Sequence, residues 1–456
     1  MIKRTLQEVA QMMGVEEGIE GAENIEIHGI TIDSRKIEKG NLFIPFKGEK
    51  VDGHRFVEAA INSGAAASLW QKDVPNPPKG LPLLYVEDPL KSIQQLAKSY
   101  RHELGVKVVG VTGSNGKTST KDITTNLLSL KYKVQKTEGN YNNHLGLPLT
   151  VLNLQEDTDI AVLEMGMSSR GEIDFLTKLA EPDVVVITNI GESHLLDLGS
   201  REGIAAAKLE IINGLKPTGR VVYFGDEPLL SNEITKLTCL ERKTFGIKTN
   251  NDLYPTTIQT RENGSCFQIN ESDRVFDLPI LGKHNILNAL AAMLVADYFA
   301  ISYEEMDEGF KTLKLTNMRM ELLTGKKGVH IINDAYNASP TSMLAAIDVV
   351  KNLPGFKKKV MVLGDMLELG TDEEIYHEQV GKSICGDAID YVFTYGQLGQ
   401  FIAKGAKTLL PEKQVMAFLQ KKELIHALKE VVDEETVVLV KASRGMKLEE
   451  VVKALQ

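Results

Sequence analysis

The chain has few cysteines, and none is placed for a structural role. Its 456 residues include three, Cys239, Cys266 and Cys385, which lie far apart and form no C-x-x-C pair. This spacing excludes the disulfide framework of a small secreted domain and the usual zinc-binding pairs. We expect each thiol to act as a small buried hydrophobe, and we expect the protein to be cytoplasmic.

A long hydrophobic run is also missing. Residues 1–6 lack the apolar core of a signal peptide. The most apolar helical stretch, residues 289–300, contains Asp297 and is shorter than the roughly 20 residues that cross a bilayer. We therefore expect no membrane span.

Basic residues do not exceed acidic ones. The chain has 52 Lys and Arg against 62 Asp and Glu, a formal net charge of −10, whereas a nucleic-acid-binding protein usually presents a basic face. We expect no nucleic-acid partner and a monomer that acts on small molecules. A chain of 456 residues exceeds one hydrophobic core, so several domains are expected.

A glycine-containing turn between an apolar run and a helix is the most informative feature present. Residues 106–112 predict a buried strand, and Gly113 and Gly116 let the backbone direct successive N–H groups at an anion. The helix predicted to begin near Lys117 adds unpaired N–H groups, Lys117 adds a positive charge, and Thr118 adds a hydroxyl for Mg²⁺. The segment therefore predicts a nucleoside triphosphate site. Its nucleotide-binding residues are expected to be Thr112, Gly113, Ser114, Asn115, Gly116, Lys117 and Thr118.

The turn departs from the standard G-x-x-x-x-G-K-[ST] pattern, because Val111 stands where that pattern has its first glycine. A strand-to-helix turn that merely contains glycines is the alternative, but Lys117 and Thr118 after an apolar strand favour a phosphate loop. The chain contains no Asn-Lys dipeptide, so the guanine-reading N-K-x-D motif of P-loop switches is missing. The residues also do not fit G-x-G-x-x-G, which disfavours a nicotinamide cofactor.

Apolar runs that alternate with helical stretches predict an α/β fold. Short runs at residues 106–112, 159–164 and 183–189 indicate parallel strands, and residues 253–278 indicate a small antiparallel sheet. Further strands are expected at residues 221–224, 329–333, 359–364, 391–395 and 436–441. We predict three domains, at residues 1–98, 99–316 and 317–456.

Chemically competent side chains follow the predicted strands of the middle domain, where open α/β sheets bind ligands. Glu164 ends one strand and would serve as a Mg²⁺ ligand, although a solvated carboxylate is the alternative. His194 follows the next strand by a short loop, and Lys208 lies in a predicted helix. From the residues alone, both are read more readily as ordinary surface side chains.

Amide side chains gather in two further places. Asn142 and Asn143 belong to a polar loop at residues 140–144, which suits either contacts to a polar ligand or a simple turn. Asn285 opens a predicted helix and could cap it. Asn288 lies inside that apolar helix, where a buried amide needs partners that an adenine edge would supply.

The last domain carries polar strand ends of its own, at residues 333–340, 365–368 and 443–445. Helix capping by Asp334, Asn337 or Ser339 is one interpretation. Polar strand ends on one side of a sheet instead favour a second wall of a ligand site.

Taken together, these segments resemble the Mur ligases, ATP-dependent amide-forming enzymes of peptidoglycan precursor synthesis. The resemblance covers nearly the whole chain. Its motifs stand, in the family's order, at residues 31–35, 40–45, 52–54, 112–118, 164, 191–194, 207–210, 284–292 and 317–321. Residues 333–340 and 364–370 resemble the subgroup that adds D-alanyl-D-alanine to UDP-N-acetylmuramoyl-tripeptide, with Ser339 where Asn is expected. The Asp-Asn-Pro-Arg signature of the subgroup that adds diaminopimelate or lysine is absent.

The resemblance implies a role for each candidate residue. The implied catalytic set is Lys117, Glu164, His194 and Lys208. Thr118 and Glu164 are implied to hold one Mg²⁺, and His194 and a carbamylated Lys208 a second. The implied ATP contacts outside the phosphate loop are Asn285, Asn288, Arg319 and Asp334. Ser34 and Arg35 are implied to hold the UDP group, and the other implied substrate contacts are Asn142, Asn143, Tyr336, Asn337 and Arg444.

The implied reaction forms an acyl phosphate from the tripeptide carboxylate and ATP, which the amine of D-alanyl-D-alanine then attacks. The implied architecture is a central P-loop ATPase domain with a parallel sheet, flanked by a small N-terminal α/β UDP-binding domain and a C-terminal Rossmann-like domain. The alternatives are a folylpolyglutamate-synthase-like ligase, another Mur ligase, an inactive binding-only homologue and a P-loop switch.

Overall fold

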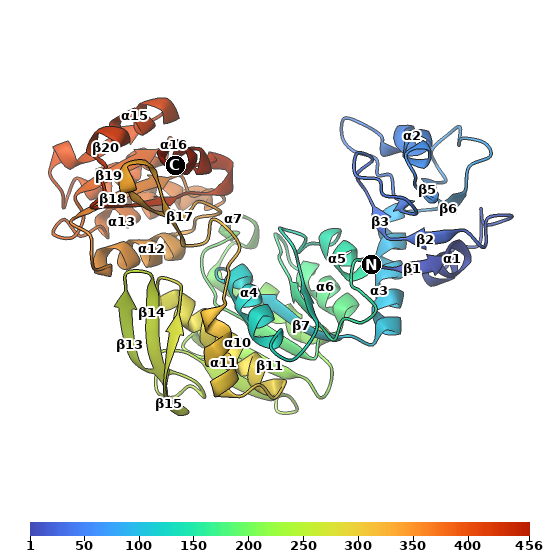
Figure 1. Ribbon diagram of the computed structural model, residues 1–456, viewed down its shortest axis with the longest axis horizontal. Helices are drawn as coiled ribbons and strands as arrows, with labels where there is room; N and C mark the ends of the chain where they lie inside the picture. Colours follow the sequence, from blue (N-terminus) through green and yellow to red (C-terminus); the bar gives the residue numbers. More distant parts are fainter.

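The computed structural model describes residues 1–456 as an elongated α/β molecule with three domains. Figure 1 shows the N-terminal sheets at one end, the C-terminal sheet at the other, and the central sheet between them. The expected three-domain α/β architecture is therefore confirmed. The domain bounds remain predictions, and the first of them, at residue 98, falls inside helix α3 (Pro89–Leu104).

The N-terminal domain is small and built from short elements. They are β1 (Lys3–Thr5), α1 (Leu6–Met13), β2 (Glu26–His28), β3 (Ile30–Thr31), β4 (Leu42–Phe43), α2 (Val57–Asn62), β5 (Ala67–Gln71) and β6 (Leu83–Val86). β1 pairs with β2, and β3 to β6 form a four-stranded parallel sheet. Thr5 and Glu8 form a capping box at the start of α1, and Gly14, at φ +69°, ends that helix.

A six-stranded parallel sheet forms the centre of the molecule. Its strands are β7 (Lys107–Thr112), β8 (Val134–Lys136), β9 (Ile160–Glu164), β10 (Val184–Ile187), β11 (Arg220–Phe224) and β12 (Glu241–Phe245). They lie in the order β12-β11-β10-β7-β9-β8. Alternate residues of β7 enter different cores, because Val108 packs on the α3 side and Val109 packs on the side of α4 (Lys117–Leu128) and α10 (Lys283–Tyr298). Burial of both faces explains the continuous apolar runs, and the predicted parallel strands are confirmed.

The remaining central helices surround this sheet. They are α5 (Gly146–Leu152), α6 (Glu172–Ala180), α7 (Leu195–Leu198), α8 (Arg201–Leu209), α9 (Pro228–Ile234) and α11 (Tyr303–Lys311). The predicted antiparallel sheet is present as β13 (Pro255–Arg261), β14 (Gly264–Ile269) and β15 (Ser272–Leu278). Phe267 and Phe276 stack with ring centroids 5.4 Å apart and pack against Phe310 of α11, which attaches this sheet to the central core.

The C-terminal domain repeats the α/β alternation. Its elements are β16 (Glu321–Thr324), β17 (His330–Asp334), α12 (Pro340–Asn352), β18 (Lys358–Gly364), α13 (Glu373–Lys382), β19 (Tyr391–Tyr395), α14 (Gly399–Ala406), β20 (Val415–Phe418), α15 (Lys421–Val431), β21 (Thr436–Lys441) and α16 (Glu449–Leu455). The sheet order is β16-β17-β21-β18-β19-β20, and only the edge strand β16 runs antiparallel to its neighbour. The carboxyl ends of β17, β21 and β18 are therefore adjacent, as the interpretation of a polar wall requires.

The cysteine prediction is wrong in part. Cys266 is buried, but Cys385 is half-buried and Cys239 is exposed. Cys239 lies in the turn between α9 and β12, where the backbone follows the surface. No helix in the structure combines the length and the apolar character needed to cross a membrane.

Candidate functional site

The phosphate loop connects β7 to α4, and its glycines are required by close neighbours. Gly113 has φ +148°, and a Cβ added there would lie 1.8 Å from Thr188 Oγ1 on the adjacent strand end. Gly116 has φ +81°, and its added Cβ would lie 2.4 Å from Asn288 Oδ1. No side chain caps the start of α4, so its first N–H groups are free to bind an anion.

Lys117 is folded over the loop that carries it. Its Nζ donates to Gly113 O at 2.7 Å and to Ser114 O at 3.4 Å. Burial lowers the pKa of Lys117, the charge of Glu164 opposes this shift, and the charge of Arg319 adds to it. A phosphate group bound in the loop would supply the negative charge that this ammonium lacks.

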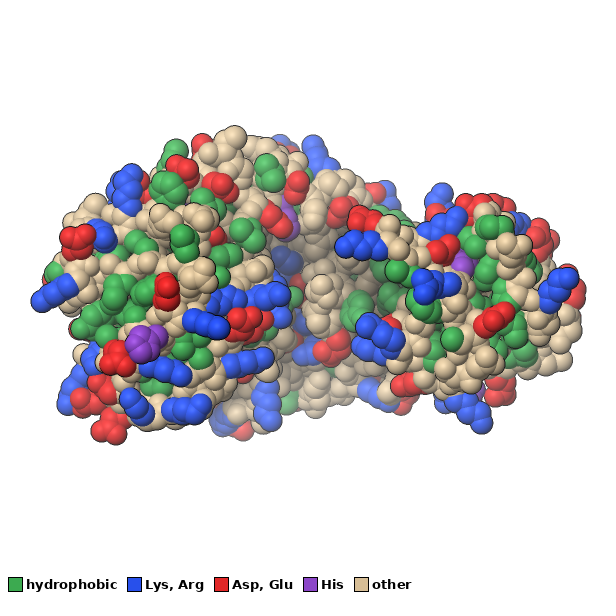
Figure 2. All heavy atoms as spheres, turned by 90° about the horizontal axis from the view of Figure 1, so that it is seen from above, with side chains coloured by type: hydrophobic (Ala, Val, Ile, Leu, Met, Phe, Trp, Pro, Cys, Tyr) green, Lys and Arg blue, Asp and Glu red, His purple; other side chains and the backbone are tan.

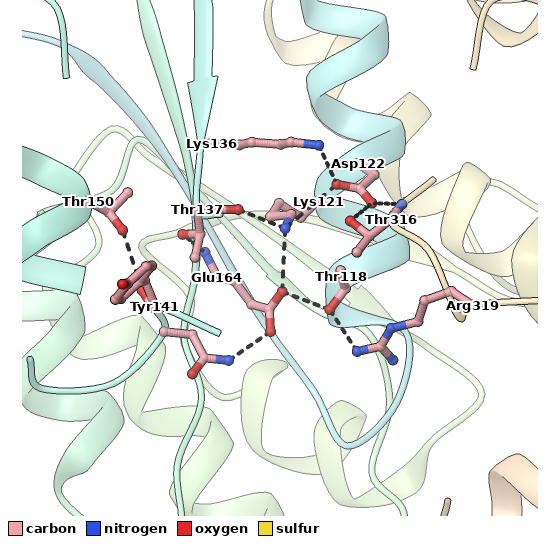
Figure 3. A network of polar contacts seen from close by, with 11 residues as sticks. Thr118, Lys121, Asp122, Lys136, Thr137, Tyr141, Thr150, Glu164, Thr316 and Arg319 are labelled. Carbon is pink, nitrogen blue, oxygen red and sulfur yellow. Dashed lines mark hydrogen bonds and ion pairs between the residues drawn. The ribbon is translucent and has the colours of Figure 1, made fainter. Parts of the chain in front are cut away.

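Glu164 and Thr118 meet at the start of α4, as Figure 3 shows. Thr118 Oγ1 donates to Glu164 Oε2 at 2.9 Å, and Asn142 Nδ2 donates to Glu164 Oε1 at 2.8 Å. Arg319 Nη2, from the C-terminal domain, donates to Thr118 Oγ1 at 3.1 Å. The structure thus brings together four of the predicted site residues, from one helix, the end of one strand and two loops.

Lys208 is a buried lysine on α8 with only 2% of its surface exposed. Burial holds its pKa well below the usual value, and the charge of Lys117 lowers it further. A lowered pKa favours the uncharged, nucleophilic form of the amine, which makes Lys208 chemically different from the surface lysine that its sequence suggested.

His194 is the N-cap residue of α7, and its backbone is left-handed, with φ +62°. Its Nδ1 lies 3.1 Å from Glu368 Oε2 but is not aligned for a hydrogen bond. Burial and the charge of Lys117 lower the pKa of His194, while Glu368 opposes the shift. Sequence reasoning placed Glu368 in a polar strand end but did not predict that it would face His194.

One cavity of about 730 Å³ collects most of these side chains between the central and C-terminal domains. Figure 2 shows the molecule hollowed above the central domain, between its two outer domains. The predicted residues that line the cavity are Ser114, Asn115, Gly116, Lys117, Thr118, Asn142, Asn143, Glu164, His194, Lys208, Asn285, Asn288, Arg319, Asp334, Tyr336 and Asn337. Asn115 Nδ2 and Arg319 Nε are buried there without hydrogen-bond partners, which indicates a polar ligand.

The amides of α10 form a short chain on the floor of this cavity. Asn288 Nδ2 donates to Asn285 Oδ1 at 3.0 Å, and Asn285 Nδ2 donates to Leu281 O at 2.8 Å. Gly282 is the N-cap residue of this helix, so the capping interpretation of Asn285 is wrong. Both amides are buried and line the cavity, next to Gly116.

The C-terminal wall is held by ion pairs and an aromatic ring. Asp334 Oδ2 accepts from Lys441 Nζ at 2.6 Å, and sequence reasoning did not anticipate Lys441. The guanidinium of Arg319 lies 4.2 Å from the centre of the Tyr336 ring. Ser339 caps α12, as one interpretation proposed, and its Oγ also donates to Asn115 Oδ1 at 3.2 Å across the domain interface.

Several predicted residues do not line the cavity. Thr112 is buried behind the loop and donates to Met165 O at 2.9 Å, while Gly113 is packed against Thr188. Arg444 lies at the rim, 5.8 Å from the centre of the Tyr336 ring, with its side chain 54% exposed.

Ser34 and Arg35 lie outside the cavity as well, in the N-terminal domain. The Arg35 guanidinium holds Asp33 through bonds of 2.8 and 2.9 Å and keeps the pKa of Asp33 at about 2. Asp33 and Lys36, which flank Ser34 and Arg35 in the sequence, line a second cavity of about 520 Å³ shared with the central domain. In this arrangement the N-terminal residues face the central domain at a different place from the phosphate loop.

Comparisons with known proteins give one answer along the whole chain. The description "Mur ligase family, catalytic domain" matches residues 26–101, "Mur ligase middle domain" matches 111–296, and "Mur ligase, glutamate ligase domain" matches 318–444. The UDP-N-acetylmuramoyl-tripeptide–D-alanyl-D-alanine ligase of Bacillus subtilis (strain 168) is 54% identical over 455 residues, covering 100% of this chain and 99% of that protein. The ligase of the same name from Escherichia coli (strain K12) is 34% identical, with 100% and 99% covered.

Solved structures agree. MurF from Acinetobacter baumannii has a TM-score of 0.90 at 29% identity, covering 100% of this chain and 99% of that one. MurF from Thermotoga maritima, solved in complex with ADP, has a TM-score of 0.83 at 30% identity, covering 94% and 97%. Folylpolyglutamate synthase from Mycobacterium tuberculosis, at 16% identity with 80% and 94% covered, shares the fold alone, with a TM-score of 0.63. This chain therefore belongs to the Mur ligase family.

Proposed function

We propose that this chain joins D-alanyl-D-alanine to UDP-N-acetylmuramoyl-tripeptide, with conversion of ATP to ADP and phosphate, to form a peptidoglycan precursor. The single observation that carries the proposal is the cavity where the phosphate loop, Glu164, His194 and the buried Lys208 meet. Full-length similarity to ligases of that name supports the choice of substrates. We also propose that the chain acts as a monomer in the cytoplasm.

Charge is the main obstacle to the first step. The tripeptide carboxylate and the γ-phosphate of ATP are both anions and must come together. Lys117 in the phosphate loop would stabilise the negative charge that grows as the carboxylate oxygen attacks phosphorus and ADP leaves. The amine of D-alanyl-D-alanine then attacks the acyl carbon, the amide bond forms with loss of a proton from nitrogen, and phosphate leaves. Water must be excluded while the acyl phosphate exists.

The donor atoms at the start of α4 fit a magnesium ion. Thr118 and Glu164 present a hydroxyl and a carboxylate 2.9 Å apart, which are hard oxygen ligands. No group of three or more His, Cys, Asp or Glu side chains gathers to enclose a metal, as expected if phosphate oxygens and waters complete the coordination. A bound ion would neutralise part of the charge on the reacting phosphate.

We propose that Lys208 is carbamylated. In its uncharged form, which burial favours, Nζ would attack carbon dioxide, form an N–C bond and release a proton, which leaves an anionic carbamate in place of the amine. The carbamate oxygen and His194 would then hold a second Mg²⁺. This explains why a lysine lies buried beside a histidine and a phosphate loop, where a cation would repel Lys117.

Replacing Ser34 and Arg35 together by alanine is expected to raise the KM for the UDP substrate by about tenfold or more, since each lost polar contact to a charged group is worth ~1.5–3 kcal/mol. The KM for ATP should stay near its original value, because neither side chain lies near the phosphate loop. Steady-state kinetics with each substrate varied in turn measure both values. Equal increases in the two KM values would contradict the assignment of this domain to the UDP group.

Phosphate release from ATP and Mg²⁺ tests the proposed function directly. Release is expected only when both UDP-N-acetylmuramoyl-tripeptide and D-alanyl-D-alanine are present, with formation of the UDP-linked pentapeptide. Parallel reactions with the lysine and the diaminopimelate forms of the tripeptide identify the preferred substrate. Release that needs neither substrate, or that only a folate stimulates, would contradict the proposal and leave a nucleotide site alone.

A further inference from the structure

The linker between the central and C-terminal domains lies along the phosphate-loop helix. Thr118 and Asp122 stand four residues apart, on the same face of α4. Arg319 Nη2 donates to Thr118 Oγ1 at 3.1 Å, and Asp122 Oδ2 accepts from the backbone N of Thr316 at 2.8 Å and from Thr316 Oγ1 at 2.7 Å (Figure 3). The linker is therefore fastened to α4 at two points, one helical turn apart.

The carboxylate of Asp122 is buried beside two lysine side chains. Its side chain is 1% exposed, and Oδ1 accepts from Lys136 Nζ at 2.7 Å and lies 3.6 Å from Lys121 Nζ. Burial would raise the pKa of Asp122, but the charges of Lys121 and Lys136 outweigh it and hold the pKa below the usual value. The group is thus an ionised carboxylate, which accepts stronger hydrogen bonds from Thr316 than a neutral acceptor would.

The same network reaches the predicted metal ligand. Lys121, also 1% exposed, donates to Thr137 O at 2.8 Å and lies 3.9 Å from Glu164 Oε2. Thr137 Oγ1 in turn accepts from the backbone N of Glu164 at 3.0 Å. Charges of alternating sign therefore run from the domain linker, through Asp122 and Lys121, to the carboxylate beside Thr118.

Beyond Thr316 the linker adopts a backbone that is unusual for its residues. Met318 has φ +63° and Met320 has φ +51°, in the left-handed region that side chains other than glycine rarely occupy. Such conformations cost ~1–3 kcal/mol each and persist where surrounding contacts impose them. Met318 N donates to Glu321 Oε2 at 3.0 Å and Met320 N donates to Asp334 Oδ1 at 3.2 Å, both within the C-terminal domain. Both left-handed residues are therefore held by the C-terminal domain, shortly after the residue that is bonded to α4.

We propose that Asp122, acting through Thr316, is a positioning residue that sets where Arg319 enters the nucleotide site. Residue 316 stays fixed to α4, and the C-terminal domain turns about residues 317–320. Arg319 then reaches the phosphate loop from a fixed starting point, although it belongs to a separate domain. The inference rests on the proposed function only in requiring that the cavity bind a nucleotide.

Thr316→Val removes one of the two hydrogen bonds from Thr316 to Asp122, while it keeps the backbone N–H and the side-chain shape. Calorimetric titration with ADP and Mg²⁺ is expected to show about tenfold weaker binding, equivalent to ~1.4 kcal/mol. The KM for ATP should rise in parallel, and the KM for D-alanyl-D-alanine should not. Asp122→Asn should act in the same direction, because the neutral amide has one acceptor oxygen in place of two charged ones and cannot accept from both Thr316 and Lys136 as strongly.

Two matched controls separate positioning from general damage. Thr316→Ser keeps the hydroxyl and should bind ADP as the unmodified protein does. Lys136→Met removes a charge partner of Asp122 but leaves both bonds to Thr316, so ADP binding should also be retained. Unchanged ADP affinity in Thr316→Val, or an equal loss in Thr316→Val and Thr316→Ser, would overturn the inference.

A double-mutant cycle with Arg319→Ala tests the route of the effect. If Asp122 and Thr316 act through Arg319, Thr316→Val should weaken ADP binding no further once Arg319 is gone. Additive losses would instead show a direct effect on the fold or on the phosphate loop and would refute the proposal. These titrations need neither peptide substrate, so they remain decisive even if the unmodified protein binds ADP but does not ligate D-alanyl-D-alanine.

Discussion

Replacing Lys208 by alanine is expected to slow ligation by about 10³-fold, because the change removes a charge-stabilising group from the reacting centre. The expectation follows from burial, because a simple cation is unfavourable at a position that is 2% exposed and where the pKa of the amine is lowered. As a carbamate it would contribute an anionic oxygen ligand beside His194. Folding should be little affected, because the side chain has no ion-pair partner to lose and burial of its charge is unfavourable.

Chemical rescue and labelling separate this role from others. Formate or acetate added to Lys208→Ala should restore part of the activity, since a small carboxylate can occupy the space of the missing carbamate. The unmodified protein in ¹³C-bicarbonate should give a carbamate carbon signal that Lys208→Ala lacks. Lys178→Ala, which removes an exposed helix lysine paired with Asp174, serves as the control and should keep full activity. Full activity in Lys208→Ala would refute the metal-bridging role.

The sequence was sufficient to predict the fold where a strand is buried on both faces, because such a strand is apolar along its whole length. The strands β7, β9 and β10 are buried on both faces, so each reads as an uninterrupted apolar run and was predicted within two residues of its bounds. The edge strands β8 and β12 were not predicted. Most of their residues are only partly buried, and β8 spans three residues whose pairing with β9 comes from tertiary structure.

The site could be predicted where chemistry is local to one turn, and less well where it depends on contacts between domains. The phosphate loop carries its own signature in Gly116, Lys117 and Thr118. The contact between His194 and Glu368 joins segments from two domains, and no pattern in either segment announces it. The hydrogen bonds between Asp122 and Thr316 could not be predicted either. An acidic residue in a helix and a threonine in a linker are both common, and neither indicates a contact with the other. The resemblance to a family supplied Lys208, whose burial alone distinguishes it from a surface lysine.

Replacing Gly113 by alanine is expected to damage both the stability of the central domain and the binding of nucleotide. The added methyl group would lie 1.8 Å from Thr188 Oγ1 and 3.1 Å from the backbone N of the same residue, in a backbone at φ +148°. The left-handed backbone and the overlap together should cost ~2–5 kcal/mol. The overlap can be relieved if the loop moves away from β10, or if Thr188 rotates and loses its hydrogen bond to Asn115 O. Either change would disturb the loop whose N–H groups face the phosphates. We therefore expect a lower thermal midpoint of the central domain and at least about tenfold weaker binding of ADP.

Gly105→Ala provides the control that isolates backbone strain. Gly105 ends α3 at φ +61°, and nothing lies within 4 Å of an added Cβ. That change should cost only ~1 kcal/mol and should leave ADP binding intact. Thr188→Ala combined with Gly113→Ala removes the overlapping oxygen, so the pair should be less damaging than the sum of the two single changes. If Gly113→Ala proves no worse than Gly105→Ala in stability and ADP affinity, the close packing of the loop against β10 does not hold it in its phosphate-binding shape.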